Sequence, residues 1–190
     1  LIATRDGDDT VNGGAGNDKL IGGTGIDTLS GSQGVDHLYG FSGNDTLSGG
    51  AGNDYIIGGT GDDTILGGDG DDTIEAQTGN DTVTTGSGAD TVYGGLGGDA
   101  VTVNGSGNKT IDGGPGTDSL TISYGSIAGI SDFTIDVSNG YTSLTDSSSN
   151  TILYKNIETL VIGSASYVGV YDGVATSGST TLNTSGNYTD

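Results

Sequence analysis

The chain has 190 residues, a formal net charge of −21, 31% hydrophobic residues and no cysteine. The acidic charge makes nucleic acid and anionic membrane surfaces poor partners, because like charges repel. The sequence has no run of 18 apolar residues, so we expect no membrane span, and without cysteine no disulfide or thiolate metal site can stabilise the fold.

Residues 4–102 form eleven consecutive units of nine residues. A typical unit, GGTGDDTIL at 58–66, has glycine at positions 1, 2 and 4, aspartate at position 6 and an apolar residue at position 8. Position 6 holds Asp9, Asp18, Asp27, Asp36, Asp45, Asp54, Asp63, Asp72, Asp81, Asp90 and Asp99. Position 8 is always Val, Leu or Ile, and a flexible acidic linker would keep no such register.

Each unit predicts one tight turn followed by one short strand. The three residues around position 8, such as 64–66, suit a strand whose central side chain points inward. The six residues before them suit a turn, because glycines allow positive φ and let backbone carbonyls approach a common point. Two units make one coil of 18 residues, and successive coils are expected to stack about 4.8 Å apart as parallel strands.

Stacking places the aspartates of every second unit above one another, so Asp63 is expected over Asp45 and under Asp81. Carboxylates at this spacing repel strongly unless a cation lies between them. Carboxylate and carbonyl ligands select a hard ion. A flexible cage of several oxygens favours calcium over magnesium, which requires strict octahedral geometry.

The repeat ends between residues 103 and 121. Val103 is an additional residue that shifts the phase, the next unit (104–112) has Lys109 at position 6, and a regular unit (113–121) follows with Asp118. An ammonium group cannot ligate calcium, because it offers only donors. We therefore expect no complete calcium site between Asp90 and Lys109, with the ammonium either close to Asp90 or carried away as the turn swings outward.

These units resemble the repeats-in-toxin (RTX) family, whose nonapeptide GGxGxDxUx, with U apolar, builds calcium-bound rolls. The resemblance covers residues 4–121 and implies an all-β fold, a right-handed parallel β-roll (a β-solenoid). It also implies Ca²⁺ ions between adjacent turns, held by the position-6 aspartates, including Asp118, and by turn carbonyls, such as those of segments 40–43 and 58–61 between Asp45 and Asp63. The stacked turns leave eleven gaps, and because the end sites are incomplete we expect roughly 8–10 ions. The turn glycines expected to contribute are Gly14, Gly16, Gly23, Gly25, Gly34, Gly43, Gly50, Gly52, Gly59, Gly61, Gly68, Gly70, Gly79, Gly88, Gly95 and Gly97.

After residue 121 the period stops, and apolar residues alternate with polar ones between Gly, Ser and Asn. This pattern predicts strands within 119–124, 132–137, 141–146, 151–162 and 167–171. We divide the chain into a roll (1–121) and a β-rich region (122–190), which is either a C-terminal β cap over the open end of the roll or the start of another β domain. Residues 176–190 are predicted to be a loose tail or linker.

The sequence offers no catalytic constellation. His37 is the only histidine and is expected on the solvent-exposed surface, and neither a His-Glu-x-x-His motif nor a Gly-x-Ser-x-Gly motif occurs. The strict period of the aspartates indicates ligands rather than a glycosidase pair. We therefore expect no catalytic residues and no enzymatic activity in this chain.

The two outer faces of the roll are expected to differ. One carries the hydroxyl ladder Thr10, Thr28, Thr46, Thr64 and Thr82, interrupted by Leu66 and Ala100. The other carries the apolar row Ile21, Tyr39, Ile57 and Tyr93. Ordinary strand composition explains both faces, and the alternative is that the apolar row contacts the cap, a neighbouring copy or a ligand.

The sequence therefore predicts a calcium-binding structural or adhesive module of a secreted or cell-surface bacterial protein, such as an adhesin or S-layer protein, that folds on extracellular calcium. Type I secretion is implied by the RTX resemblance. One alternative is an accessory domain of an extracellular hydrolase or epimerase, and another is an ice-binding module that uses the hydroxyl ladder. The chain has no methionine, so we interpret it as a piece of a longer protein.

Overall fold

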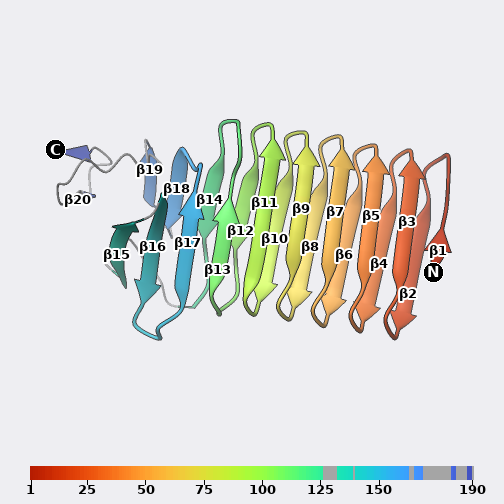
Figure 1. The fold of residues 1–190 in the computed structure, drawn as a ribbon, viewed down its shortest axis with the longest axis horizontal. Helices are drawn as coiled ribbons and strands as arrows, with labels where there is room; N and C mark the ends of the chain where they lie inside the picture. Colours follow the sequence, from red (N-terminus) through yellow and green to blue (C-terminus); the bar gives the residue numbers. More distant parts are fainter. Residues whose placement is uncertain (126–131, 139, 163–164, 169–180, 183–187, 190) are drawn as a thin grey trace.

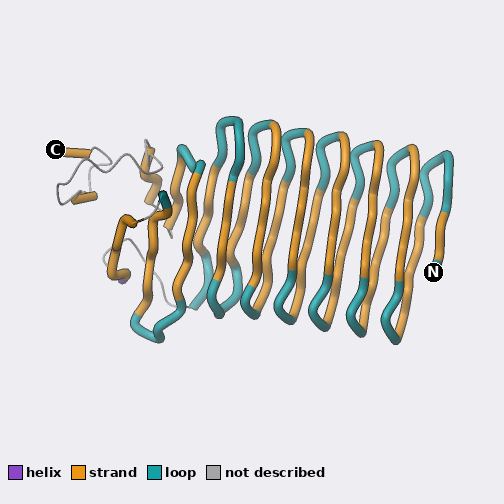
Figure 2. The backbone as a smooth tube through the Cα atoms, viewed as in Figure 1, coloured by secondary structure: helices purple, strands orange, loops and turns teal. Residues whose placement is uncertain are grey.

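The structure is a computed structural model that describes residues 1–125, 132–138, 140–162, 165–168, 181–182 and 188–189. The chain winds back and forth between two sheets, and the coils stack side by side into a flattened, elongated roll (Figure 1). Turns line the two long edges of the roll and strands fill the space between them (Figure 2). None of these described residues belongs to a helix that could cross a membrane.

The first sheet contains, in spatial order, β1 (Ile2–Ala3), β3 (Lys19–Thr24), β5 (His37–Ser42), β7 (Tyr55–Thr60), β9 (Thr73–Thr78), β11 (Asp90–Leu96), β13 (Lys109–Asp112), β17 (Thr151–Lys155), β16 (Tyr141–Asp146) and β15 (Phe133–Ser138). The second contains β19 (Ala165–Val168), β18 (Thr159–Ile162), β14 (Ser119–Ile122), β12 (Ala100–Val103), β10 (Thr82–Ser87), β8 (Thr64–Asp69), β6 (Thr46–Ala51), β4 (Thr28–Gln33) and β2 (Thr10–Ala15). A separate antiparallel pair joins β20 (Thr181–Leu182) to β21 (Tyr188–Thr189).

The register confirms the predicted coil of 18 residues and the predicted parallel β-solenoid. Leu47 in β6 pairs with Leu29 in β4 on one side and with Ile65 in β8 on the other. The inward side chains at position 8 of the repeats, from Val11 to Val101, form a single file between the two sheets, and each is at most 6% exposed. Because each coil buries only two such residues, the apolar core is thin, and other interactions must stabilise the stack.

The strands are longer than the predicted three residues. Most repeat strands span six, because the first three residues of the following unit continue the ladder, as Gly68 in β8 does by pairing with Gly50 in β6. The glycines at position 2 join the ladder in spite of a positive φ, which is 121° at Gly68. A strand interior containing Gly at positive φ does not match the ordinary alternation, so the sequence pattern does not reveal it.

The coil continues past the last repeat. β13 pairs in parallel with β17, and β14 pairs in parallel with β18, so residues 151–162 stack on the roll in the same register as a repeat. β15 and β16 are inserted before them and extend the first sheet in antiparallel fashion. The predicted boundary at residue 121 therefore does not mark the end of the parallel stacking, and the role of this region as a cap stays a prediction.

The strand predictions for this region are largely confirmed. β16 matches 141–146, β15 matches 132–137 within one residue, and β14 occupies the start of 119–124. The segment 151–162 is two strands rather than one, because the chain turns at 156–158 to change sheets. The predicted strand 167–171 begins within β19, and its residues 169–171 lie outside the described residues, as does most of the predicted tail at 176–190.

Candidate metal centre

The aspartates stack as predicted, and from Asp27 onward each position-6 carboxylate accepts a backbone hydrogen bond from the turn one coil before it. The backbone N–H of Asp45 donates to Oδ1 of Asp63 at 2.8 Å, and the N–H of Asp63 donates to Oδ1 of Asp81 at 2.8 Å. The same bond joins Asp9 to Asp27, Asp18 to Asp36, Asp27 to Asp45, Asp36 to Asp54, Asp54 to Asp72, Asp72 to Asp90, Asp81 to Asp99 and Asp99 to Asp118. Two continuous carboxylate ladders therefore run along the roll, one in each row of turns.

The second oxygen of most of these carboxylates has no hydrogen-bond partner within the described residues. This holds for the buried Oδ2 atoms of Asp27, Asp36, Asp45, Asp54, Asp63, Asp72, Asp81, Asp99 and Asp118, whose residues are at most 3% exposed. A buried charged oxygen without a partner is strongly destabilising. In their ionised form these carboxylates require a counter-charge that the neighbouring side chains do not supply.

The glycine at position 1 makes room for this oxygen. A methyl group placed on Gly58 would lie 2.5 Å from Asp63 Oδ2 and 2.7 Å from the carbonyl oxygen of Ala76 in the next coil. The same crowding would occur at Gly40 and Gly49. We call this space the cradle. It is bounded by a position-1 residue, by the aspartate Oδ2 of the same unit and by the carbonyl oxygen of the position-1 residue in the next coil. Its oxygen donors are the kind that calcium prefers.

Burial changes the acidity of these carboxyl groups. Burial raises the pKa of Asp63 from 3.8 to about 7, the hydrogen bond from the Asp45 backbone lowers it in part, and the charges of Asp81 and Asp45 raise it further. Burial likewise raises the pKa of Asp72 to about 7. The protein alone therefore disfavours the ionised carboxylates, and a cation in the cradle would favour them.

Lys109 shows that a positive charge fits such a position. Its Nζ lies 2.9 Å from Asp90 Oδ2 and donates to the carbonyl oxygens of Gly88 at 2.5 Å and Ser106 at 3.1 Å. Lys109 is only 1% exposed, so the ammonium is enclosed by one carboxylate and two turn carbonyls from adjacent coils. The expectation that the ammonium lies close to Asp90 is confirmed, and the alternative of an outward-swinging turn is wrong.

The predicted turn glycines all have the expected backbone conformation. The sixteen glycines assigned above to the metal sites have φ between 93° and 143°, in the region that favours glycine. A methyl group on Gly61 or Gly70 would also collide with the carbonyl of the glycine one coil below. The conformational part of the prediction is therefore confirmed, whereas the ligand role of each carbonyl and aspartate stays a prediction.

The first coil differs from the others. Asp9 and Asp18 are only half-buried, because no complete coil lies beneath them. Their backbone N–H groups still donate to Asp27 and Asp36. The sites at this end of the roll are therefore more open to water than the central ones.

The position-1 glycines Gly40 and Gly58 belong to the segments 40–43 and 58–61 expected to supply carbonyls, but the space that they leave beside Oδ2 was not predicted. One set of residues was missed altogether, a row of Asn and Asp at position 5. Oδ1 of Asn44 accepts the N–H of Asp62 at 3.0 Å, and Oδ1 of Asp62 accepts the N–H of Asn80 at 2.8 Å. This outer ladder ties the same turns together on their exposed side.

Within the parts of the chain that the structure describes, no three His, Asp or Glu side chains gather at one point. Side-chain carboxylates thus supply only part of any coordination shell, and backbone carbonyls must supply the rest. Calcium accepts such mixed oxygen shells. The arrangement is that of a repetitive cation-binding β-roll, in which each ion would connect two successive coils.

A comparison with family models identifies this roll. The model of the RTX calcium-binding nonapeptide repeat matches residues 1–29, 21–56, 39–74, 48–83 and 66–101. Because these matches cover more than half of the chain, the chain belongs to the RTX calcium-binding repeat family. The match ends before the unit with Lys109, where the period shifts. No curated protein matches the chain significantly.

Proposed function

We propose that this chain is a structural or adhesive module of a secreted or cell-surface bacterial protein that folds on meeting extracellular calcium. The observation that carries the proposal is the set of nine buried Asp Oδ2 atoms, recurring from Asp27 to Asp118, that have no hydrogen-bond partner among the described residues. Membership of the RTX repeat family, whose proteins are typically secreted by bacteria, supports the extracellular setting.

The dependence on calcium follows from the balance of forces in the roll. The core is one file of apolar side chains, while each central coil buries two carboxylates. Burying unpaired carboxylates opposes folding. Ions that bind only the folded roll add their binding free energy to its stability, so folding and binding become one process. The chain would then stay unfolded where calcium is scarce.

The test is a calcium titration followed by far-ultraviolet circular dichroism. We expect a spectrum without β-structure in chelator and a cooperative gain of β signal on adding calcium. Magnesium at the same concentration is the control and should give little signal, because its strict octahedral geometry does not suit these cages. A β spectrum that is the same in chelator and in calcium would contradict the proposal.

We infer a non-catalytic role, since the aspartates recur with the strict period of ligands rather than as a single catalytic pair. His37 is exposed on the outer face, where its ring packs on Tyr55 with centroids 5.7 Å apart. On the same face Lys19 lies over the Tyr39 ring at 4.6 Å, and Tyr55 donates to Glu75 at 2.7 Å. This surface suits contact with a partner more than catalysis. An accessory role beside a separate hydrolase or epimerase domain is compatible with it.

One observation favours a second function, ice binding. Thr10, Thr28, Thr46, Thr64 and Thr82 are all exposed and pair in register along one face. Thermal hysteresis measured in calcium buffer tests this alternative directly. Freezing and melting points that coincide would rule it out, while Thr46→Val in an active protein should reduce the gap between them.

A further inference from the structure

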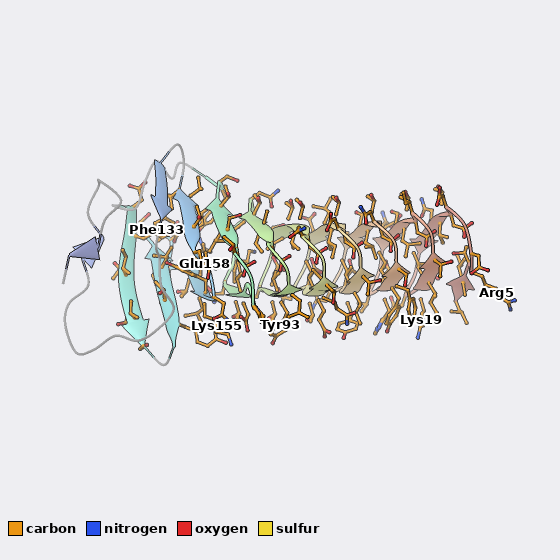
Figure 3. The ribbon with its side chains drawn as sticks, turned by 90° about the horizontal axis from the view of Figure 1, so that it is seen from above. Arg5, Lys19, Tyr93, Phe133, Lys155 and Glu158 are labelled. Carbon is orange, nitrogen blue, oxygen red and sulfur yellow. The ribbon has the colours of Figure 1, made fainter. Side chains whose placement is uncertain are left out.

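The coil beyond the last repeat carries a turn that sits on the turn holding Asp118. Residues 156–158 connect β17 to β18, and both strands stack in parallel on the last repeat coil. Lys155 and Glu158 lie toward the end of the roll opposite Arg5 (Figure 3). This turn belongs to no nonapeptide unit, and the family match ends well before it.

Glu158 takes the place that the next aspartate would hold. The backbone N–H of Asp118 donates to Oε2 of Glu158 at 2.6 Å, as the N–H of Asp45 donates to Oδ1 of Asp63 at 2.8 Å. The carbonyl oxygen of Asp118 accepts the N–H of Thr159 at 3.0 Å, as the carbonyl of Asp45 accepts that of Thr64 at 2.8 Å. The carboxylate ladder of this row therefore continues by one member, with a longer side chain bridging a shorter turn.

The cradle is present here too. A methyl group on Gly113 would meet the carbonyl oxygen of Asn156 and would lie 2.7 Å from Asp118 Oδ2. Asp118 is 1% exposed, and its Oδ2 is one of the nine buried oxygens that have no partner among the described residues. An unpaired, fully buried carboxylate oxygen thus faces a carbonyl from a coil outside the repeats.

The carbonyl of Asn156 is held in place by its surroundings. Asn156 has a φ of 52°, its Nδ2 donates to Asp112 Oδ1 at 2.6 Å, and the neighbouring Lys155 forms an ion pair with Asp112 Oδ2 at 2.8 Å. The next side chain, Ile157, is 1% exposed and anchors the turn in the core. Asp112 is therefore engaged, and Lys155 is directed to it, so neither group is expected to fill the cradle.

From this geometry we propose an additional calcium site at the end of the roll, formed by Asp118 Oδ2, the Asn156 carbonyl oxygen and the Glu158 carboxylate. The ion fastens the non-repeat coil of β17 and β18 to the repeats. The two rows of turns thus end differently, because the row with Asp90 closes on the ammonium of Lys109 and the row with Asp118 closes on an ion. The proposal rests on the calcium-dependent folding proposed above.

The test counts bound ions by native mass spectrometry of the full chain at saturating calcium. Glu158→Gln keeps the size and hydrogen-bonding oxygen but removes the charge, and Gly113→Ala fills the cradle while keeping both carboxylates. Each should bind one ion fewer than the unmodified chain. Glu75→Gln, at the only other glutamate of the chain, is the matched control and should keep the full number.

Hydrogen exchange gives a second reading for a variant that folds less well. The amides of residues 151–162 should lose calcium-induced protection in Glu158→Gln and keep it in Glu75→Gln, while the amides of 28–66 stay protected in both. Full ion number together with unchanged protection in both Glu158→Gln and Gly113→Ala would overturn this site alone. An unmodified chain that binds no calcium would instead overturn the proposed function, and this site with it.

Discussion

Asp63 illustrates how one residue connects three coils. Its carboxylate accepts the N–H of Asp45, its own N–H donates to Asp81, and it is 1% exposed. Each central aspartate therefore serves the turn below and the turn above. The neighbouring Asp62 is exposed and makes its hydrogen bonds on the outer ladder. Two adjacent aspartates thus have different environments.

Asp63→Ala should lower the free energy of unfolding in calcium by about 3–5 kcal/mol, because it damages two sites and leaves the adjacent carboxylates without their ion. Asp62→Ala should cost about 1 kcal/mol, the value of an exposed hydrogen bond. Denaturant titration in calcium buffer measures both. Equal losses would show that position 6 has been assigned wrongly.

Thr85 and Lys109 are the two residues that set the Asp90 site apart. Thr85 stands at position 1, where most units have glycine, and it is fully buried. Lys109 supplies the positive charge at the same site. The double variant Thr85→Gly with Lys109→Asp restores the repeat pattern and should bind one more calcium ion than the unmodified chain. Native mass spectrometry counts the ions, and an unchanged number would contradict the role of the ammonium as the local counter-charge.

At the scale of the strand and turn, Phe41 marks a strained position. It stands at position 2, where φ is positive, and has a φ of 77° and an exposure of 53%. A left-handed conformation costs a residue with a β-carbon about 1 kcal/mol or more. The ring gains little in return, since its contact with Tyr39 has centroids 6.4 Å apart.

Phe41→Gly should therefore raise the free energy of unfolding in calcium by about 0.5–1 kcal/mol, despite the greater freedom of glycine in the unfolded chain. The control is Leu96→Gly, another exposed apolar residue of a repeat strand, which has no positive φ. That substitution should be destabilising by about 0.5–1 kcal/mol. Loss of stability in both variants would mean that the Phe41 ring makes a contact that matters.

The regular elements were predictable because one period fixes register, core and aspartate stacking together. The insertion of Val103 was visible too, and the structure buries it beside Ile122 in the core. Glu158 could not be found in this way, since it lies 40 residues after Asp118 and the inserted strands β15 and β16 intervene. The position-5 ladder was hidden because side chains that accept an N–H from the coil above look like ordinary turn residues.

Considered as a whole, the roll should respond to pH in opposite ways with and without calcium. Burial raises the pKa values of Asp63 and Asp72 to about 7 and those of Asp81 and Asp118 to about 6. In the unfolded chain these groups titrate near pH 3.8. Between about pH 4 and pH 7 the folded chain therefore binds more protons than the unfolded chain. The stabilisation from protonation is complete below about pH 4 and is lost as pH rises through 6–7.

In calcium-free buffer we therefore expect more β-structure at pH 5 than at pH 8, measured by circular dichroism. With calcium the order reverses, because protons and ions compete for the same carboxylates, and the calcium concentration at half-folding should rise as pH falls from 8 to 5. A midpoint independent of pH over this range would mean that these carboxylates do not hold the ions.

The position of the two ends of the roll has a mechanical consequence. β1 lies at one end of the stack and β18 and β19 at the other (Figure 1), so tension between them pulls along the stacking axis. Such a load opens the ladders one coil after another, as in a zipper, instead of shearing them all at once. Each coil of 18 residues would release about 55 Å, from ~3.3 Å per extended residue less the ~4.8 Å that the coil occupied. In calcium, single-molecule stretching should show a series of such steps, and in chelator a smooth extension. The roll would then act as an extensible tether whose stiffness is set by the calcium around it.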